Sequence, residues 1–154
     1  MNSVRTIIER LSAKLIAACL LSSLLAHADG LSPVGHWKTF DENTGEPEAI
    51  IRIQQQGGAL YGWIEKILGE RKDARPTRCT ECEGKLKNAP IIGLKIIQDM
   101  QREDDDWRGH IIDPKSGDIY NATMFPIEEG RKLELRGYIG IPLLGRTQVW
   151  KRVP

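Results

Sequence analysis

Alternation of apolar and polar residues along short runs constrains the fold of this chain more than any other feature. Ala49, Ile51 and Ile53 alternate with the polar residues Glu48, Arg52 and Gln54, apart from Ile50. Leu133 and Leu135 repeat the pattern between charged residues. A period of two with one polar face is typical of antiparallel strands that are buried on one side. We therefore expect a protein built mainly of β-strands.

Glycine-bearing turns separate the strand-like runs at 56–58, 114–117 and 128–131. Strands joined by tight turns form hairpins, and hairpins in series form a meander, a sandwich or a barrel. The strands are expected at 35–40, in the run ending near Gln55, and at 59–68, 91–98, 107–113, 118–127, 132–138 and 146–153. These number about eight, the usual count for a small closed up-and-down barrel.

The run at 91–98 has two interpretations. Ile92 and Ile96 recur at a helical spacing, and Asn88 is a suitable cap for a helix. Four isoleucines and a glycine within the run favour a strand instead. We adopt the strand, and the helix stays open as the alternative.

The N-terminal segment has the order of a secretory signal peptide. Basic side chains precede a short apolar run at 15–25, which ends in Ala-His-Ala at 26–28. This order is typical of a leader helix that is cleaved on export, and the run is too short for a bilayer, which takes roughly 20 residues. We expect residues 1–28 to be removed, and residues 29–154 to form one domain in the periplasm without a membrane-spanning segment.

Other interpretations of this leader are a buried N-terminal helix and a lipoprotein signal that places a lipid on Cys19. We rank the lipoprotein below simple export, because Lys14 leaves almost no apolar region before the cysteine. Removal of the leader leaves 19 basic and 20 acidic residues, a formal charge of −1. Nucleic-acid binding needs a basic excess on one face, so we expect no nucleic-acid partner.

Cys79 and Cys82 are the only cysteines outside the leader. Two thiols in an oxidising compartment favour a disulfide, here within the polar stretch 69–89, which we interpret as a loop over the open end of the barrel. A zinc site is an alternative, but such a site commonly needs four ligands. Besides the two cysteines, only His36, His110 and acidic side chains are available to complete it. Thiol redox chemistry is another alternative, although the strand–helix unit that usually carries it is not visible.

Two ends of the chain resemble the lipocalin and fatty-acid-binding superfamily. Gly35 and Trp37 reproduce the Gly-x-Trp that opens the first strand of lipocalins, and Arg152 stands in the last strand where those proteins place a basic residue. The resemblance implies that the basic side chain lies over the tryptophan ring and closes one end of the barrel. Such a cation–π contact with a buried stem is worth roughly 1–2 kcal/mol.

Longer motifs carry a second resemblance. They are PIIGL at 90–94, GHIIDPKSGDIY at 109–120, LELRGYIG at 133–140 and GRTQVWKR at 145–152. Together they are similar to the domain of unknown function 2147, a bacterial exported family. This resemblance implies an all-β, lipocalin-like up-and-down antiparallel β-barrel outside the inner membrane, with no assigned catalytic residues.

Four aromatic residues are our candidate ligand contacts, because small-molecule pockets are mostly apolar and aromatic. They are Tyr61, Trp63, Trp107 and Tyr120. A barrel of about eight strands holds either packed side chains or one ligand, so these rings are either pocket or core. We expect non-enzymatic binding of a small, largely apolar molecule, with no cofactor and no metal. No Gly-x-Ser-x-Gly nucleophile motif or Walker-type phosphate loop is present.

Two other functions stay open. One is an interaction module for envelope proteins or the outer membrane that uses the outer barrel face and the loop at 69–89; an exposed apolar patch with a filled barrel would favour it. The other is a metal or thiol-redox centre at the cysteine pair.

Overall fold

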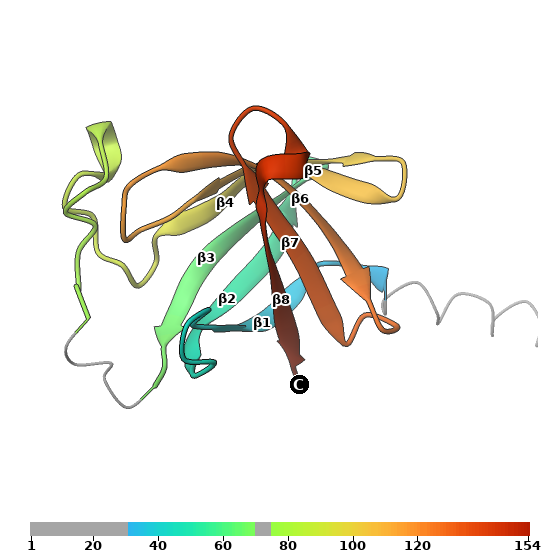
Figure 1. Cartoon of the computed structure of the whole chain (residues 1–154), viewed down its shortest axis with the longest axis horizontal. Coiled ribbons are helices and arrows are strands. Elements are labelled where there is room, and N and C mark those ends of the chain that lie inside the picture. Colours follow the sequence, from blue (N-terminus) through green and yellow to red (C-terminus); the bar gives the residue numbers. More distant parts are fainter. Residues whose placement is uncertain (1–30, 70–74) are drawn as a thin grey trace, which may run out of the picture. The chain divides into compact units, whose positions relative to one another are not determined.

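A computed structural model describes residues 31–69 and 75–154, and the predicted leader lies outside them (Figure 1). The elements are β1 (Gly35–Phe40), β2 (Pro47–Gln56), β3 (Ala59–Ile67), η3 (Gly84–Leu86), β4 (Lys95–Glu103), β5 (Asp106–Ile112), β6 (Ile119–Ile127), β7 (Lys132–Tyr138), η4 (Pro142–Leu144) and β8 (Arg146–Val153). In this part of the chain no helix is long and apolar enough to cross a membrane.

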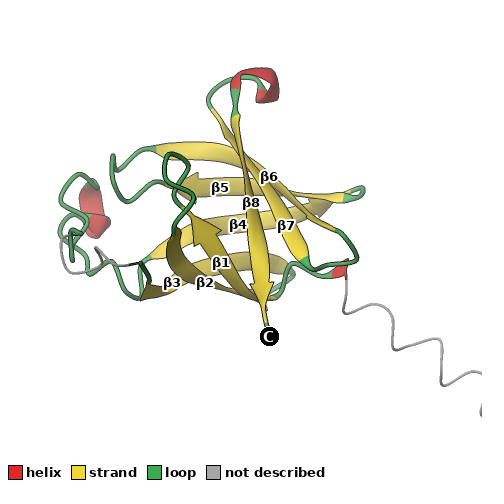
Figure 2. Cartoon of the chain, turned by 60° about the horizontal axis from the view of Figure 1, so that its bottom comes forward, coloured by secondary structure: helices red, strands yellow, loops and turns green. Residues whose placement is uncertain are grey.

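The sheet is a closed barrel in which each strand pairs antiparallel with the next (Figure 2). β1 also pairs with β8, with Trp37 opposite Arg152, and this last pairing closes the sheet. The expected all-β, up-and-down antiparallel barrel of eight strands is therefore confirmed.

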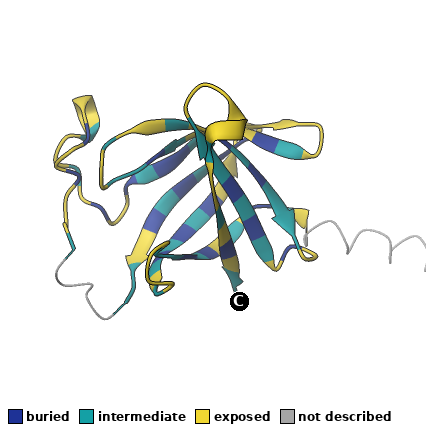
Figure 3. Cartoon of the chain, viewed as in Figure 1, coloured by how far each residue is buried: buried dark blue, intermediate teal, exposed yellow. Residues whose placement is uncertain are grey.

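The alternation in the sequence decides which side chains fill the barrel. Ala49, Ile51 and Ile53 of β2 are buried, as are Leu133 and Leu135 of β7. Figure 3 shows the bands of buried residues that result along the strands. Because a shift of one residue would turn each of these sets to the solvent, burial fixes the pairing register.

The strand expected at 91–98 is of the correct type but begins later. β4 starts at Lys95 and continues to Glu103, and residues 91–94 form a turn before it. Gly93 has a φ of 88°, in the left-handed region that favours glycine and interrupts an extended strand. Ile91 and Leu94 are nevertheless buried, so the apolar pattern there reflects packing of a turn.

One end of the barrel is closed by Arg152. Its guanidinium carbon lies 4.2 Å from the centre of the Trp37 ring, which is fully buried. The guanidinium donates hydrogen bonds to the backbone carbonyls of Gly130, Val34 and Ser32, at 2.6, 2.9 and 2.7 Å. One side chain thus ties the N-terminal segment and the β6–β7 turn to the last strand.

Gly35 lies against this guanidinium. Its φ is 138°, and a Cβ atom there would stand 2.7 Å from Nη1 of Arg152. A larger residue would therefore be strained and would displace the arginine. This close approach gives a physical reason for the glycine in the Gly-x-Trp motif.

Candidate functional site

The opposite end of the barrel opens into a cavity of about 1070 Å³. Its deep wall is apolar and includes Ala49, Ile51, Ile64, Ile96, Ile112, Leu135 and Trp150. Its charged lining residues stand at strand ends and in connections around the mouth, and they are Asp41, Glu42, Glu48, Arg75, Asp113, Lys115 and Arg146. Ligand sites commonly measure roughly 300–1000 Å³, so this cavity is large enough for one small molecule.

Polar atoms along the wall are already bonded within the protein. The backbone N–H of Ala49 donates to Oγ1 of Thr39 at 3.1 Å. Nε1 of Trp150 donates to Gln148 at 2.9 Å, and the amide of Gln148 donates in turn to Glu42 at 2.8 Å. A guest molecule therefore meets mainly hydrocarbon surface in the deep part of the cavity.

Gly137 on β7 presents bare backbone to the cavity. A Cβ atom there would lie 3.7 Å from both Ile111 Cγ2 and Tyr120 Cβ, which is ordinary contact. Its φ is not in the left-handed region, so neither crowding nor backbone conformation requires a glycine. What the glycine does is leave space open inside the barrel.

Ion pairs link two connections across the mouth. Nζ of Lys115, in the β5–β6 turn, lies 2.7 Å from Glu48 and 3.8 Å from Asp41, which flank the β1–β2 connection. The hydrogen bond with Glu48 raises the pKa of Lys115. Backbone N–H groups of Thr44 and Asn43 lower the pKa of Asp41. The network joins parts of the chain that lie four strands apart in the barrel.

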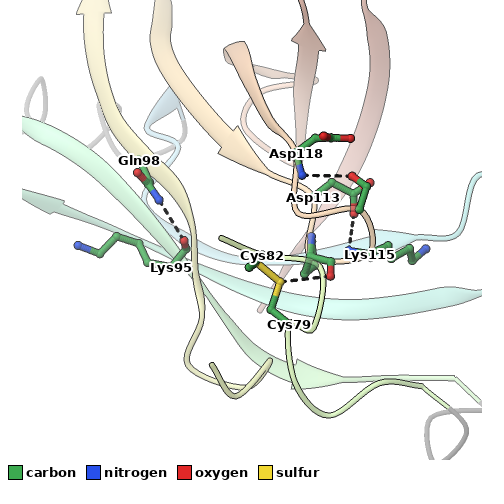
Figure 4. The surroundings of a disulfide bond; sticks show 9 residues. Cys79, Cys82, Lys95, Gln98, Asp113, Lys115 and Asp118 are labelled. Carbon is green, nitrogen blue, oxygen red and sulfur yellow. Dashed lines mark hydrogen bonds between the residues drawn. A yellow bond between two sulfur atoms is a disulfide. The ribbon is translucent and has the colours of Figure 1, made fainter. Parts of the chain in front are cut away.

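The rim segment, residues 75–94, contains the disulfide between Cys79 and Cys82 (Figure 4). The predicted disulfide is confirmed, and both cysteines are buried. The N–H of Cys79 donates to the carbonyl of Ala89, and the N–H of Asn88 donates back to the carbonyl of Cys79. A zinc or thiol-redox centre here would need free thiolates. Within the described ranges, no group of three His, Cys, Asp or Glu side chains is arranged to hold a metal.

The rim segment packs tightly against the β5–β6 turn. Sγ of Cys79 lies 3.4 Å from the carbonyl oxygen of Pro114, a contact without a proton because the sulfur is oxidised. At Gly117 a Cβ atom would overlap the backbone carbonyl of Glu81, so only glycine fits. The segment also contributes Arg75, Pro76 and Ile91 to the cavity lining. It therefore forms part of the wall at the open end.

Two of the four aromatic candidates lie on the outer face of the barrel. Tyr61 and Trp63 alternate with the buried Leu60 on β3 and do not line the cavity. The guanidinium of Arg52 lies 5.2 Å from the Trp63 ring centre, and Nζ of Lys95 lies 4.8 Å from that of Tyr61. The expectation that these two rings contact a ligand inside the barrel is therefore corrected.

The other two aromatic candidates differ in their position relative to the cavity. Tyr120 lines the cavity, and its hydroxyl donates to Asp118 at 3.3 Å. Trp107 is buried outside the cavity lining, and its Nε1 has no hydrogen-bond partner among the described residues. Only Tyr120 remains a candidate contact. The residues that sequence reasoning missed are the aliphatic side chains of the wall, which alternation identified only as core.

Comparison with solved structures supports the class of protein. The barrel is similar to protein HP1028 from the human pathogen Helicobacter pylori, which belongs to the lipocalin family, with a TM-score of 0.67 and 17% identity over 80% of this chain and 84% of that chain. At this identity the likeness concerns the fold, and the fold is that of a lipocalin-like β-barrel. A search of curated proteins found no match.

The family resemblance inferred from the motifs is confirmed as well. The chain belongs to the family described as "Uncharacterized protein conserved in bacteria (DUF2147)", whose model matches residues 35–152.

Proposed function

We propose that this protein is a non-enzymatic carrier that binds one small, largely apolar molecule inside the barrel. The cavity of about 1070 Å³ with an apolar deep wall is the observation that supports this proposal most strongly. A guest that buries about 500 Å² of apolar surface gains about 12 kcal/mol. After an association cost of at least about 4 kcal/mol, the remainder corresponds to a dissociation constant near micromolar.

The placement of charge narrows the class of ligand. No charged side chain stands in the deep wall, whereas Glu48, Arg75 and Lys115 lie at the mouth. A carboxylate or ammonium group deep in the cavity would be desolvated without a partner, which is costly. The ligand class is therefore an uncharged apolar body whose polar group faces the mouth.

Non-enzymatic action and export belong to the same proposal. Neither His36 nor His110 lines the cavity, so the usual general base is not available to a bound molecule. The leader-like order of residues 1–28 and the disulfide both favour a periplasmic location, because disulfides persist in oxidising compartments.

Native mass spectrometry of protein recovered from the cell envelope tests this proposal. We expect a ligand mass that is lost on denaturation, and an intact chain that begins at Asp29 without a lipid. Gly137→Leu, which projects a side chain into the cavity from a position where a Cβ atom makes only ordinary contacts, is the matched variant and should carry less of the ligand. An unprocessed chain confined to the cytoplasm would contradict export, and an equal amount of ligand on Gly137→Leu would contradict binding in the cavity.

A further inference from the structure

A group of exposed aliphatic side chains lies on the apolar loop, residues 139–145, which connects β7 to β8. Their exposed fractions are 71% for Ile139, 56% for Ile141, 81% for Leu143 and 78% for Leu144. Figure 3 shows this connection as an exposed segment that projects beyond the strands. Single exposed apolar residues are normal, but four within six residues indicate a contact surface.

The apolar loop is held in its exposed conformation by Arg136 on the outer face of β7. Nε of Arg136 donates to the carbonyl of Pro142 at 2.6 Å, and Nη2 donates to that of Leu143 at 3.1 Å. Nη1 donates to the hydroxyl of Thr147 at 2.6 Å. Because the loop is ordered before it meets a partner, little conformational entropy is lost when it binds.

The apolar loop stands at the mouth of the cavity. Ile139 and Leu144 belong to the cavity lining as well as to the exposed surface. Ile92 and Ile119, each 60% exposed, precede β4 and begin β6 at the same end of the barrel. Most of the exposed large aliphatic side chains among the described residues therefore gather around the opening.

We propose that the apolar loop inserts into the surface of a lipid bilayer and turns the mouth of the cavity toward the membrane. The four aliphatic side chains offer on the order of 400 Å², about half of the 800 Å² or so that each partner buries in a stable protein interface. The loop carries no aromatic residue or arginine of the kind that anchors protein interfaces. A narrow aliphatic tip suits a deformable hydrocarbon medium, where its burial stabilises the bound state.

Charge at the mouth indicates that this docking depends on burial of apolar surface. Arg146, at the base of the apolar loop, lies 3.9 Å from Glu42, and Lys115 lies 2.7 Å from Glu48. These basic groups already have acidic partners, so anionic lipid adds little. The proposal goes beyond ligand carriage and does not depend on it.

Vesicle flotation tests the docking, with processed protein recovered from the envelope and its N-terminus fixed by intact mass. We expect binding to pure phosphatidylcholine vesicles that changes by no more than about two-fold with added salt or phosphatidylglycerol. The double variant L143D/L144D should bind at least about ten-fold more weakly. Leu31→Asp changes a side chain that is 60% exposed near the closed end, and it is the matched control that should bind like the wild type.

A second measurement locates the contact. The emission of an environment-sensitive fluorophore attached to the variant Leu143→Cys should shift to the blue with vesicles, whereas that of the same fluorophore attached to Leu31→Cys should not. Failure of the wild type to bind either vesicle would overturn the proposal, and so would salt-sensitive binding that L143D/L144D leaves unchanged. Self-association in lipid-free buffer that L143D/L144D removes would also overturn it, because the loop would then be an interface between two copies. Loss of ligand binding alone would leave docking intact, so the two proposals fail separately.

Discussion

Arg136 and Arg152 each use a planar set of donors to hold chain that lies outside the strands. Arg152 bonds three backbone carbonyls at the closed end, and Arg136 bonds two carbonyls and the hydroxyl of Thr147 at the open end. A guanidinium suits this role because its donors are fixed in one plane, whereas an ammonium is a point charge. Burial lowers the pKa of Arg152, yet an arginine stays protonated in proteins.

Arg152→Ala should lower the free energy of unfolding by about 2–4 kcal/mol, because three carbonyls and the Trp37 ring lose their partner. Arg152→Lys should recover only part of this loss. Urea unfolding followed by tryptophan fluorescence measures both. Arg131→Ala removes an exposed arginine whose carboxylate neighbour Glu129 is 3.9 Å away, and it should change stability by less than about 0.5 kcal/mol. Equal losses for Arg152→Ala and Arg131→Ala would contradict this role of Arg152.

At the scale of elements, alternation predicted most strands correctly, but the inward face expected for β3 was the wrong one. Residues 59–64 of this strand are all apolar or glycine, so the sequence does not show which set faces inward. The inward set contains Gly62, where a Cβ atom would meet Ile97 at 2.8 Å. A large residue of the neighbouring strand fills that space, and Tyr61 and Trp63 consequently face outward. The match between a glycine on one strand and a large residue on its neighbour can be recognised only once the pairing of the strands is known.

The disulfide should stabilise the rim segment modestly. Closing a loop of about four residues is worth about 2 kcal/mol in the chain-entropy model, so C79A/C82A should lower the free energy of unfolding by about that amount. Hydrogen exchange should quicken at the amides of Asn88 and Ile91, which are bonded within the segment. Reductant should have the same effect on the wild type and none on the variant. Unchanged exchange in the variant would mean that the disulfide does not order the segment.

Lys115, at the mouth of the cavity, should make a small, pH-dependent contribution to the free energy of unfolding. We expect Lys115→Gln to cost less than about 1 kcal/mol near neutral pH, since this lysine is largely exposed. The pKa of Lys115 is raised in the folded state. Its contribution to the free energy of unfolding is therefore complete below the pKa of the unfolded chain, and it is lost as the pH rises through the pKa of the folded protein. Urea unfolding from about pH 7 to about pH 11 measures this. The exposed Lys85 supplies the control variant Lys85→Gln, and a loss of the same size there would contradict the assignment.

At the largest scale, the described part of the chain is a barrel with one end closed by Arg152 and one open end. Sequence motifs predicted the closed end, because Gly35, Trp37 and Arg152 can be recognised in the sequence. The cavity was not predictable residue by residue, since aliphatic side chains line both the packed half and the open half. Which half encloses space depends on barrel closure, on the rim segment and on the missing side chain of Gly137.

Titration with the neutral apolar fluorophore N-phenyl-1-naphthylamine tests the central claim most directly, namely that the barrel encloses a binding site. We expect one saturable site in the wild type, and at least about ten-fold weaker binding to Gly137→Leu, whose side chain takes part of the space that the ligand occupies. Glu134→Leu enlarges apolar surface on the outer face of the same strand and should bind like the wild type. No saturable binding, or equal affinity of wild type and Gly137→Leu, would contradict a ligand site inside the barrel.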